Sequence, residues 1–464
     1  MEKTSDRTFL GTEKIGVLMK KFAVPSIIAM LVSALYNIVD QLFIGQSVGI
    51  DGNAATNIAF PLTTSCIALA LLFGIGGASC FNLSMGKGDE KRAAYFAGNS
   101  SAMLFICGVV LMIITEIFLS PILTLCGAEG GIVEEYAAVY VRITAIGFPF
   151  MILTAGGGHI IRADGSPQMT MICNIVGAVI NVILDALFVL VFNWGMAGAA
   201  LATIIGQIIS AVIVIYYLRN YKTVKLTIKH FIPKFVNVKQ ISLLGMASCF
   251  NQLAMMVVQI VMNQLLATYG ESSKYGATTA IAVAGIVMKV FQVFFSFIIG
   301  LSQGSQPIES YNYGAKNYDR VRKALFLTLV LGGGLSLIAS IIFQVFPANI
   351  LSLFGEGNDD YVEFGVKFFR IFLITAIINF FQPIVSTFFT SIGKAYKGVF
   401  LSLTRQFLFF MPLLFIFSYI WKLDGIMYTA PAADILSFLV TIIMMSLELR
   451  SMKKLEMKKE KVMV

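Results

Sequence analysis

The sequence predicts an all-α polytopic membrane protein with twelve transmembrane helices arranged as two six-helix bundles. Three observations support this fold class: the composition, a series of long apolar segments and an internal repeat. Of the 464 residues, 58% are hydrophobic and only 13% are charged, and the mean hydropathy is +0.84. Soluble domains carry about 25% charged residues, so this composition excludes a soluble enzyme.

Apolar segments long enough to cross a bilayer occur twelve times along the chain. About 20 apolar residues in a helix span the hydrocarbon core. Several segments are longer than that, which permits tilted helices or polar extensions into a cavity. The expected segments are 22–46, 55–85, 94–120, 134–161, 169–193, 198–218, 241–269, 278–312, 324–347, 361–389, 399–421 and 425–448.

Lysine and arginine predict the orientation, because the cytoplasmic loops of membrane proteins are enriched in both residues. Outside the apolar segments, the loops on one side hold only Lys274 and Lys422. Both tails and the middle loop lie on the other side, which carries most of the basic residues. We therefore expect a protein of the cell membrane with both termini in the cytoplasm. The net charge of +9 then reflects topology and contact with anionic lipid, and indicates no nucleic-acid binding.

The chain also repeats itself at a constant offset of 228 residues. Gly76 and Gly86 recur as Gly304 and Gly314. Because each half has six segments, an even number, both halves enter the membrane from the same side. The pseudo-two-fold axis that relates them is therefore expected along the membrane normal. Further pairs at this offset are Ile122 and Ile350, Glu135 and Glu363, Arg142 and Arg370, and Gly165 and Gly393.

This repeat divides the chain into two lobes with flanking and connecting segments. Paired repeats characterise secondary transporters, whose sites lie near the membrane midplane. No GxxxxGK[ST] phosphate loop is present, so we expect no ATP-driven transport and no cofactor. No paired His, Cys–His or metal motif occurs, which argues against an enzyme. The expected regions are a cytoplasmic tail (1–21), an N-terminal lobe (22–220), a cytoplasmic linker (221–240), a C-terminal lobe (241–449) and a basic cytoplasmic tail (450–464).

Two acids lie inside the transmembrane segments of the N-terminal half. Asp185 is deep in the apolar stretch 174–192, and Asn181 precedes it by one helical turn on the same face. A charge at this depth costs about 2.5–3.5 kcal/mol and needs a partner, a proton or a cation. Asp40 and Thr203 lie in the first and sixth segments. Two carboxylates, an amide and a hydroxyl suit a hard cation such as Na⁺, or a shared proton.

Each of these residues also has a structural explanation. Asp40 can be a water-exposed acid near a helix end. Asp185 can pair with a structural Arg or Ser. Thr203 can bond the backbone of its own helix, as is common in membrane helices. Their joint position in one half of the chain favours the cation site.

A substrate cavity is the second expected feature. Flexible Met side chains and flat aromatic rings form adaptable pockets for mixed ligands. Asp434 is a third intramembrane acid, expected as a cation or substrate residue, with helix packing or water exposure as the alternative. Lys289 and Arg405 are expected to line the cavity of the C-terminal lobe. The expected cavity residues are Tyr36, Met151, Met255, Met256, Gln259, Met288, Phe291 and Asp434.

Several short strings carry a family resemblance. They are VDQLFIG (39–45), SMGKGDEKRA (84–93), IRADGSP (161–167), GAALAT (198–203) and GLSQGSQPIESYNYGAKNYDRVRKA (300–324), together with the Asn181-x-x-x-Asp185 pair. They resemble the multidrug and toxic compound extrusion (MATE) transporters over essentially the whole chain. The resemblance implies a cation site at Asp40, Asn181, Asp185 and Thr203, where protonation or Na⁺ binding drives release of the exported compound.

One departure from the family pattern bears on the site of coupling. Some members carry a Glu in the seventh helix, whereas the segment 241–269 holds no acid. This favours the branch of the family in which coupling takes place in the N-terminal lobe, and no metal other than Na⁺ is expected.

The resemblance implies a secondary active antiporter that exports amphipathic, often cationic, compounds in exchange for H⁺ or Na⁺. It is expected to work as a monomer surrounded by membrane lipid. Two alternatives stay open. One is a lipid-linked oligosaccharide flippase, which would have a strongly basic central cavity and often extra helices. The other is an exporter of narrow specificity for a metabolite.

Overall fold

The computed structural model describes residues 9–128, 130–354 and 359–463, and all regular structure in this part of the chain is helical. The first half contains α2 (Ile15–Ser47), α3 (Ile50–Gly86), α4 (Glu90–Ile117), α5 (Leu119–Leu125), α6 (Gly131–Ala163), α7 (Pro167–Asp185), the π-helix η1 (Ala186–Val191) and α8 (Gly195–Arg219). The second half contains α9 (Phe235–Glu271), α10 (Ala277–Gly314), α11 (Tyr318–Val345), α12 (Pro347–Ser352), α13 (Asp359–Phe372), the 3₁₀ helix η3 (Ile374–Ile377), α14 (Phe381–Ser391), α15 (Ala395–Leu403), the π-helix η4 (Thr404–Phe410) and α16 (Met411–Met463). A short 3₁₀ helix, η2 (Ile228–Phe231), lies between the halves.

The helices supply the twelve predicted membrane spans. Among the described residues, ten helices are long and apolar enough to cross a membrane, or eleven when one bent pair counts as a span. The bent pair joins α13 and η3 to α14 at an angle of 42°. One of the ten is the run through α15, η4 and α16. It contains two membrane-crossing helices, because the chain turns back at Lys422 with φ 53° and ψ −125°. The predicted number of spans is therefore confirmed.

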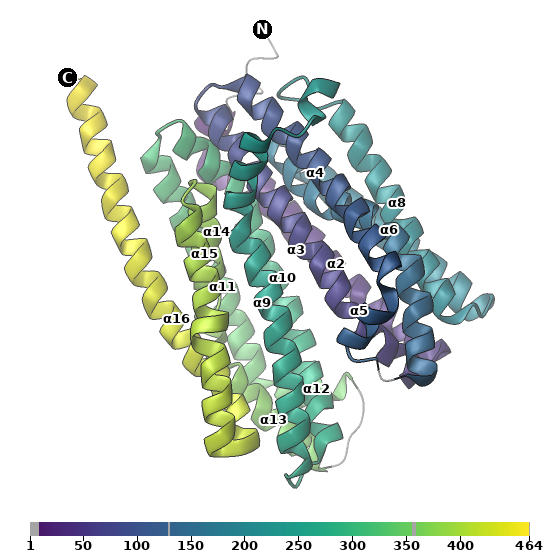
Figure 1. The fold of residues 1–464 in the computed structure, drawn as a ribbon. Coiled ribbons are helices and arrows are strands. Elements are labelled where there is room, and N and C mark those ends of the chain that lie inside the picture. Colours follow the sequence, from purple (N-terminus) through teal and green to yellow (C-terminus); the bar gives the residue numbers. More distant parts are fainter. Residues whose placement is uncertain (1–8, 129, 355–358, 464) are drawn as a thin grey trace.

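The helices form two lobes that lie side by side, with both termini at the same end of the molecule (Figure 1). Each lobe has its own apolar core. One core is built almost wholly from residues before 245, and the other from residues 258–452. A third, smaller cluster contains Phe22 of α2 with Leu301 and Ile308 of α10, and therefore joins the lobes.

Glycines let the lobes touch along α3 and α10. A Cβ atom on Gly86 would collide with the carbonyl oxygen of Tyr311, and one on Gly314 would collide with that of Leu83. The two glycines are related by the 228-residue offset, and so are Leu83 and Tyr311. The contact is thus reciprocal, and the pseudo-two-fold axis passes between these helices.

The first helix of each lobe packs in the same way against the other lobe. Gly76 of α3 lies against Ile241 of α9, and Gly304 of α10 lies against Ala23 of α2. Gly245 continues the α9 contact one turn further along the helix. We call the contact zone formed by α2, α3, α9 and α10 the seam. Glycine at these positions permits a backbone approach that any side chain would prevent.

Hydrogen bonds between the lobes lie at the end that carries the termini. Arg162 donates to the side-chain oxygen of Gln303 at 2.9 Å, and Gln306 donates to the Ser79 hydroxyl at 2.8 Å. Arg320 of α11 donates to backbone carbonyls ahead of α2. The lobes are therefore joined at this end, while their helices diverge toward the other end (Figure 1).

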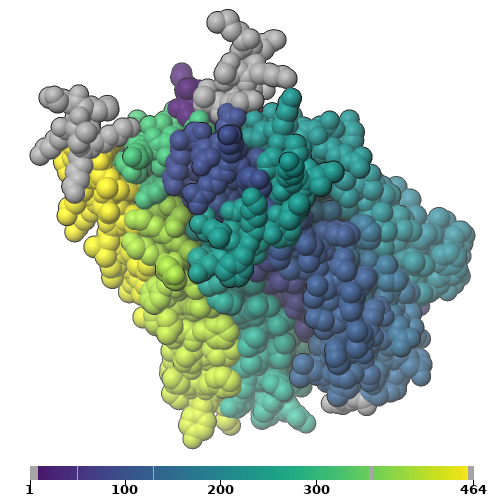
Figure 2. Space-filling model, turned by 45° about the horizontal axis from the view of Figure 1, so that its top comes forward, coloured from purple at the N-terminus to yellow at the C-terminus, as the bar shows by residue number. Residues whose placement is uncertain are grey.

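The linker between the lobes is anchored to the N-terminal lobe. The Asp164 carboxylate accepts a hydrogen bond from the backbone amide of Lys222 at 2.8 Å. Burial raises the pKa of Asp164, and hydrogen bonds from the linker act in the opposite direction. The Asn99 side chain donates to the carbonyl of His230 at 2.7 Å. Figure 2 shows this segment, in teal, on the surface beside the blue N-terminal helices.

Replacing Gly76 by Ala is expected to destabilise the protein by about 1–3 kcal/mol, because the added Cβ would meet the Ile241 backbone. Gly334→Ala is the matched control on α11, where nothing lies within 4 Å of the added Cβ. This control should gain up to about 1 kcal/mol from its lower backbone entropy. Thermal unfolding of the purified proteins in detergent measures both, and equal melting temperatures would contradict a tightly packed seam.

Candidate cation site

Three helices of the N-terminal lobe bring the predicted cation residues together. α7 packs against both α2 and α8. This places Asp40 of α2 near Asp185 of α7, so the two carboxyl groups are neighbours. The Asn181 amide of α7 donates to the Thr203 hydroxyl of α8 at 3.4 Å. Asp185 is fully buried, and Asn181 and Asp40 are 2% and 8% exposed.

The site lies where α7 changes its helical form. Asp185 is the last α-helical residue, and the π-helix η1 begins directly after it. Single π-helical turns are rare and occur often at functional sites. The Ser47 hydroxyl at the end of α2 donates to the carbonyl of Val189 in η1 at 3.4 Å. The irregular turn therefore connects the buried acid to the helix that carries its partner.

Four buried oxygen atoms of the site have no hydrogen-bond partner. They are Oδ1 of Asp40, Oδ1 of Asn181 and both carboxylate oxygens of Asp185. None of the ion pairs among the described residues involves either acid. A buried carboxylate without a partner costs several kcal/mol. A proton shared between the acids, or a hard monovalent cation held by these oxygens, would remove that cost.

Two tyrosines adjoin the acids. Tyr36, a predicted cavity residue, precedes Asp40 by one turn on α2 and neighbours both acids. Tyr140 of α6 also neighbours both acids and lies within hydrogen-bonding reach of Thr203. No motif in the sequence indicates Tyr140, because only the packing of α6 against α8 brings it to the site.

The predicted cavity residues of α9 lie beyond the seam. Met256 and Gln259 follow Gly245 by three and four helical turns and share its face, and both are half-buried. Met255 lies at the edge of this face, and its sulfur accepts a hydrogen bond from the Asn251 amide at 3.8 Å. The face that continues from Gly245 therefore carries two of the three predicted residues.

The remaining predicted cavity residues do not lie on this face of α9. Met151 packs against the core of the N-terminal lobe, and Met288 packs against that of the C-terminal lobe. Phe291 is only 8% exposed, and its ring stacks on Phe295 with 5.4 Å between centroids. The structure places Phe291 inside the core of the C-terminal lobe.

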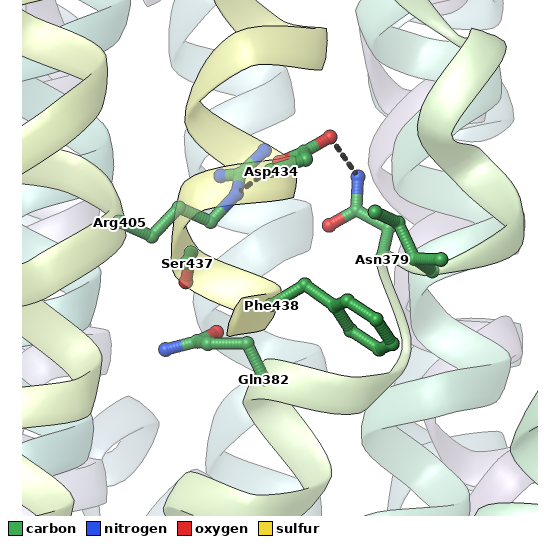
Figure 3. A pocket seen from close by; sticks show the side chains of 7 residues that line it. Asn379, Gln382, Arg405, Asp434, Ser437 and Phe438 are labelled. Atoms are coloured by element: carbon green, nitrogen blue, oxygen red, sulfur yellow. Dashed lines mark hydrogen bonds and ion pairs between the residues drawn. The ribbon is translucent and has the colours of Figure 1, made fainter. Parts of the chain in front are cut away.

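A second polar cluster surrounds Asp434 in the C-terminal lobe (Figure 3). Arg405 Nε donates to Asp434 Oδ1 at 2.7 Å. The Thr375 hydroxyl and the Asn379 amide donate to Oδ2 at 2.7 and 3.1 Å. Beside them lies a cavity of about 10 Å³, also lined by Gln382, with room for about one water molecule.

The charge of this cluster is already compensated. Asp434 is 4% exposed, pairs with Arg405 and accepts three hydrogen bonds, so it needs no further cation. Its donors come from irregular segments: Thr375 from η3, Asn379 from the bend that follows, and Arg405 from the π-helix η4. Asp434 thus connects the bent span formed by α13, η3 and α14 to the π-helix η4 through hydrogen bonds.

Two symmetric six-helix lobes, joined at one end and with two adjoining unpaired acids buried in the N-terminal lobe, define a membrane transporter rather than an enzyme. Comparison with known proteins agrees. The MatE family model matches residues 25–187 and 247–417, one stretch in each lobe. The chain belongs to this family, the MATE transporters.

Similar proteins cover nearly the whole chain. The "Multidrug export protein MepA" of Staphylococcus haemolyticus is 26% identical over 434 residues, which are 93% of this chain and 94% of the relative. The protein of the same name from Staphylococcus aureus is 24% identical over 432 residues, 92% and 93% of the two chains. A solved structure described as the outward-facing conformation of a multidrug resistance MATE family transporter has a TM-score of 0.89 at 22% identity, and the match covers 96% of this chain and 98% of that one. The predicted twelve-helix, two-lobe fold is confirmed.

Replacing Arg405 by Met is expected to destabilise the protein by about 3–5 kcal/mol, because Asp434 would stay buried without its cation. Combining Arg405→Met with Asp434→Asn should recover at least half of that loss, since no uncompensated charge remains. Thermal unfolding of the wild type, both single variants and the double variant measures the coupling. A double variant no more stable than Arg405→Met would contradict the assignment.

Proposed function

We propose that this protein is a secondary active antiporter of the cell membrane that exports amphipathic compounds in exchange for H⁺ or Na⁺. The coupling cation binds at Asp40, Asn181, Asp185 and Thr203. The four buried oxygen atoms without partners are the observation that carries this proposal. The printed name of the relatives, a multidrug export protein, supports a range of small-molecule substrates.

The charge distribution supports an outward-facing arrangement. The basic tails and middle loop favour a cytoplasmic position for both termini. The seam, which lies at the same end, then closes the cytoplasmic side, and the space between the diverging lobes opens to the outside. The similarity to a structure described as outward-facing is consistent with this arrangement. In this state an exported compound leaves and a cation enters.

Cation entry changes the electrostatics of the N-terminal lobe. A proton or Na⁺ removes negative charge from two adjoining acids, so the repulsion between α2 and α7 falls. α2 also forms the seam, where Ile27 lies against Gly300 of α10. A change in α2 therefore reaches the contact between the lobes directly. Inward movement of one proton across 100 mV supplies about 2.3 kcal/mol to the cycle.

We also propose the monomer as the working unit. Each lobe has its own core, and one chain supplies both sides of the seam. Membrane lipid is the surrounding partner, since large apolar side chains such as Ile117, Phe326 and Ile443 are exposed on the outer helices.

Asp185→Asn and Asp40→Asn are expected to lower gradient-driven efflux of a fluorescent dye by about tenfold or more, equivalent to about 1.4 kcal/mol of lost coupling. The physical reason is that a neutral amide neither takes up a proton nor attracts Na⁺. Proteoliposomes with an imposed pH gradient, and separately with an imposed Na⁺ gradient, measure the rate. Asp51→Asn is the matched control, an exposed acid at the start of α3.

The gradient that drives efflux identifies the coupling ion. Loss of that efflux in the two site variants, with Asp51→Asn unaffected, supports the assignment. Full efflux by well-expressed Asp40→Asn and Asp185→Asn proteins would rule out the cation site. Absence of any gradient-driven efflux in the wild type would rule out the antiporter.

A further inference from the structure

One face of α10 continues from the seam into the space between the lobes. At the seam, Gly300 lies against Ile27 and Gly304 lies against Ala23, so this face points toward the N-terminal lobe. Lys289 precedes Gly300 by eleven residues, and eleven residues amount to three helical turns and about 20°. Lys289 therefore lies on the same face, where it is exposed.

Side chains on this face of α10 become exposed at the point where the two lobes separate. Ile281, Gly285, Lys289 and Gln292 are all exposed. Ser296, the next position toward the seam, is only 7% exposed. This row of residues on α10 is thus covered by the N-terminal lobe at one end and exposed at the other. We call the space that it borders the cleft.

Lys289 lies within the membrane-spanning part of α10. The middle of this helix is about 10 Å from Lys289, and the hydrocarbon core extends about 15 Å on each side of its centre. An ammonium group facing lipid at this depth is unfavourable by about 2.5–3.5 kcal/mol. None of the ion pairs among the described residues involves Lys289. Its charge is therefore hydrated in the cleft and available to a ligand.

The neighbouring helix α9 adds amide groups to the same wall. Gly245 lies against Leu72 of α3, so its face also points toward the N-terminal lobe. Gln252, Gln259 and Asn263 follow on this face at intervals of two turns or one. The two glutamines are half-buried and Asn263 is exposed. These side chains can donate hydrogen bonds to a polar group placed beside Lys289.

The opposing wall is mainly apolar. The same helical spacing places Ala34 and Ile38 of α2 beyond Ile27, and Pro61 and Ser65 of α3 beyond Leu72. Among the residues named above on the facing sides of α2, α3, α9 and α10, Lys289 is the only charged one. The acids of the cation site are buried inside the N-terminal lobe and do not lie on these faces.

We propose that the cleft selects amphipathic substrates that carry an anionic group, such as a carboxylate, sulfonate or phosphate, and that Lys289 recognises this group. The amides of α9 and Gln292 bind its oxygens, and the apolar wall of the N-terminal lobe contacts the rest of the molecule. This inference rests on the proposed export function and names its substrate class.

A matched dye pair tests the proposal: a rhodamine free acid, which carries a carboxylate, and its methyl ester, which is a cation. Wild type, Lys289→Gln and Lys289→Glu are compared in proteoliposomes under the driving gradient. Lys91→Glu, at an exposed lysine in the first turn of α4, is the control. We expect the wild type to prefer the acid, Lys289→Gln to lower the acid-to-ester ratio of rates about tenfold, and Lys289→Glu to reverse the preference.

Dye binding to purified protein is measured in parallel by fluorescence anisotropy without a gradient. The charge preference and the transport activity can therefore fail separately. An acid-to-ester ratio that is the same in all four proteins, in both assays, would overturn the role of Lys289 while leaving the antiporter intact. A preference that follows residue 289 in binding, in a protein that pumps neither dye, would support the substrate class and overturn the export function.

A third arm distinguishes a soluble anion from a lipid. A fluorescent phosphatidic acid is placed in the same vesicles, and its movement between leaflets is followed. Movement that is lost in Lys289→Glu, with neither rhodamine bound, would support the anionic class and assign it to a lipid headgroup. Transport of the rhodamine acid alone would assign it to a soluble compound.

Discussion

Backbone contact at the seam fixes how the two lobes are arranged. α3 and α10 meet at Gly86 and Gly314, where any side chain larger than hydrogen would force the helices apart. Lipid provides no hydrophobic force between apolar helices, so close packing and a few hydrogen bonds must hold the lobes together. Because these contacts gather at one end, the other ends of the same four helices are free to form the walls of a cleft.

The two lobes share a fold, but the aspartates of the cation site and Asp434 differ in how their buried charge is satisfied. Asp40 and Asp185 have no cationic partner, whereas Asp434 is paired with Arg405. Asp434 is compensated by Arg405, whereas a buried acid without a cationic partner needs a proton or a metal ion. The proposed coupling therefore belongs to the N-terminal lobe. In the proposed substrate selection, the C-terminal lobe contributes Lys289 of α10.

Much of the architecture was predictable because it follows from local composition. Spans appear as apolar segments, and the lobes appear as one repeated offset. The grouping of Asp40 with Asp185 was inferred from their presence in one half of the chain. The structure places the two acids near each other in the buried part of the N-terminal lobe. Tyr140 could not be foreseen, since it reaches Thr203 through packing between separate helices. The same limit explains Phe291, an aromatic residue expected in a cavity and found in a core.

The number of helices and their division into two related lobes follow from the amino-acid sequence alone. The reason is that a chain crossing lipid must satisfy its backbone hydrogen bonds within helices, so hydropathy alone reveals them. Which side of each helix meets which neighbour depends on how the helices pack in three dimensions. Lys289 and Phe291 are two residues apart, which on a helix means about 200° of rotation. The glycine contacts of α10 at the seam set that rotation, and they direct the lysine toward the cleft and the phenylalanine into the core.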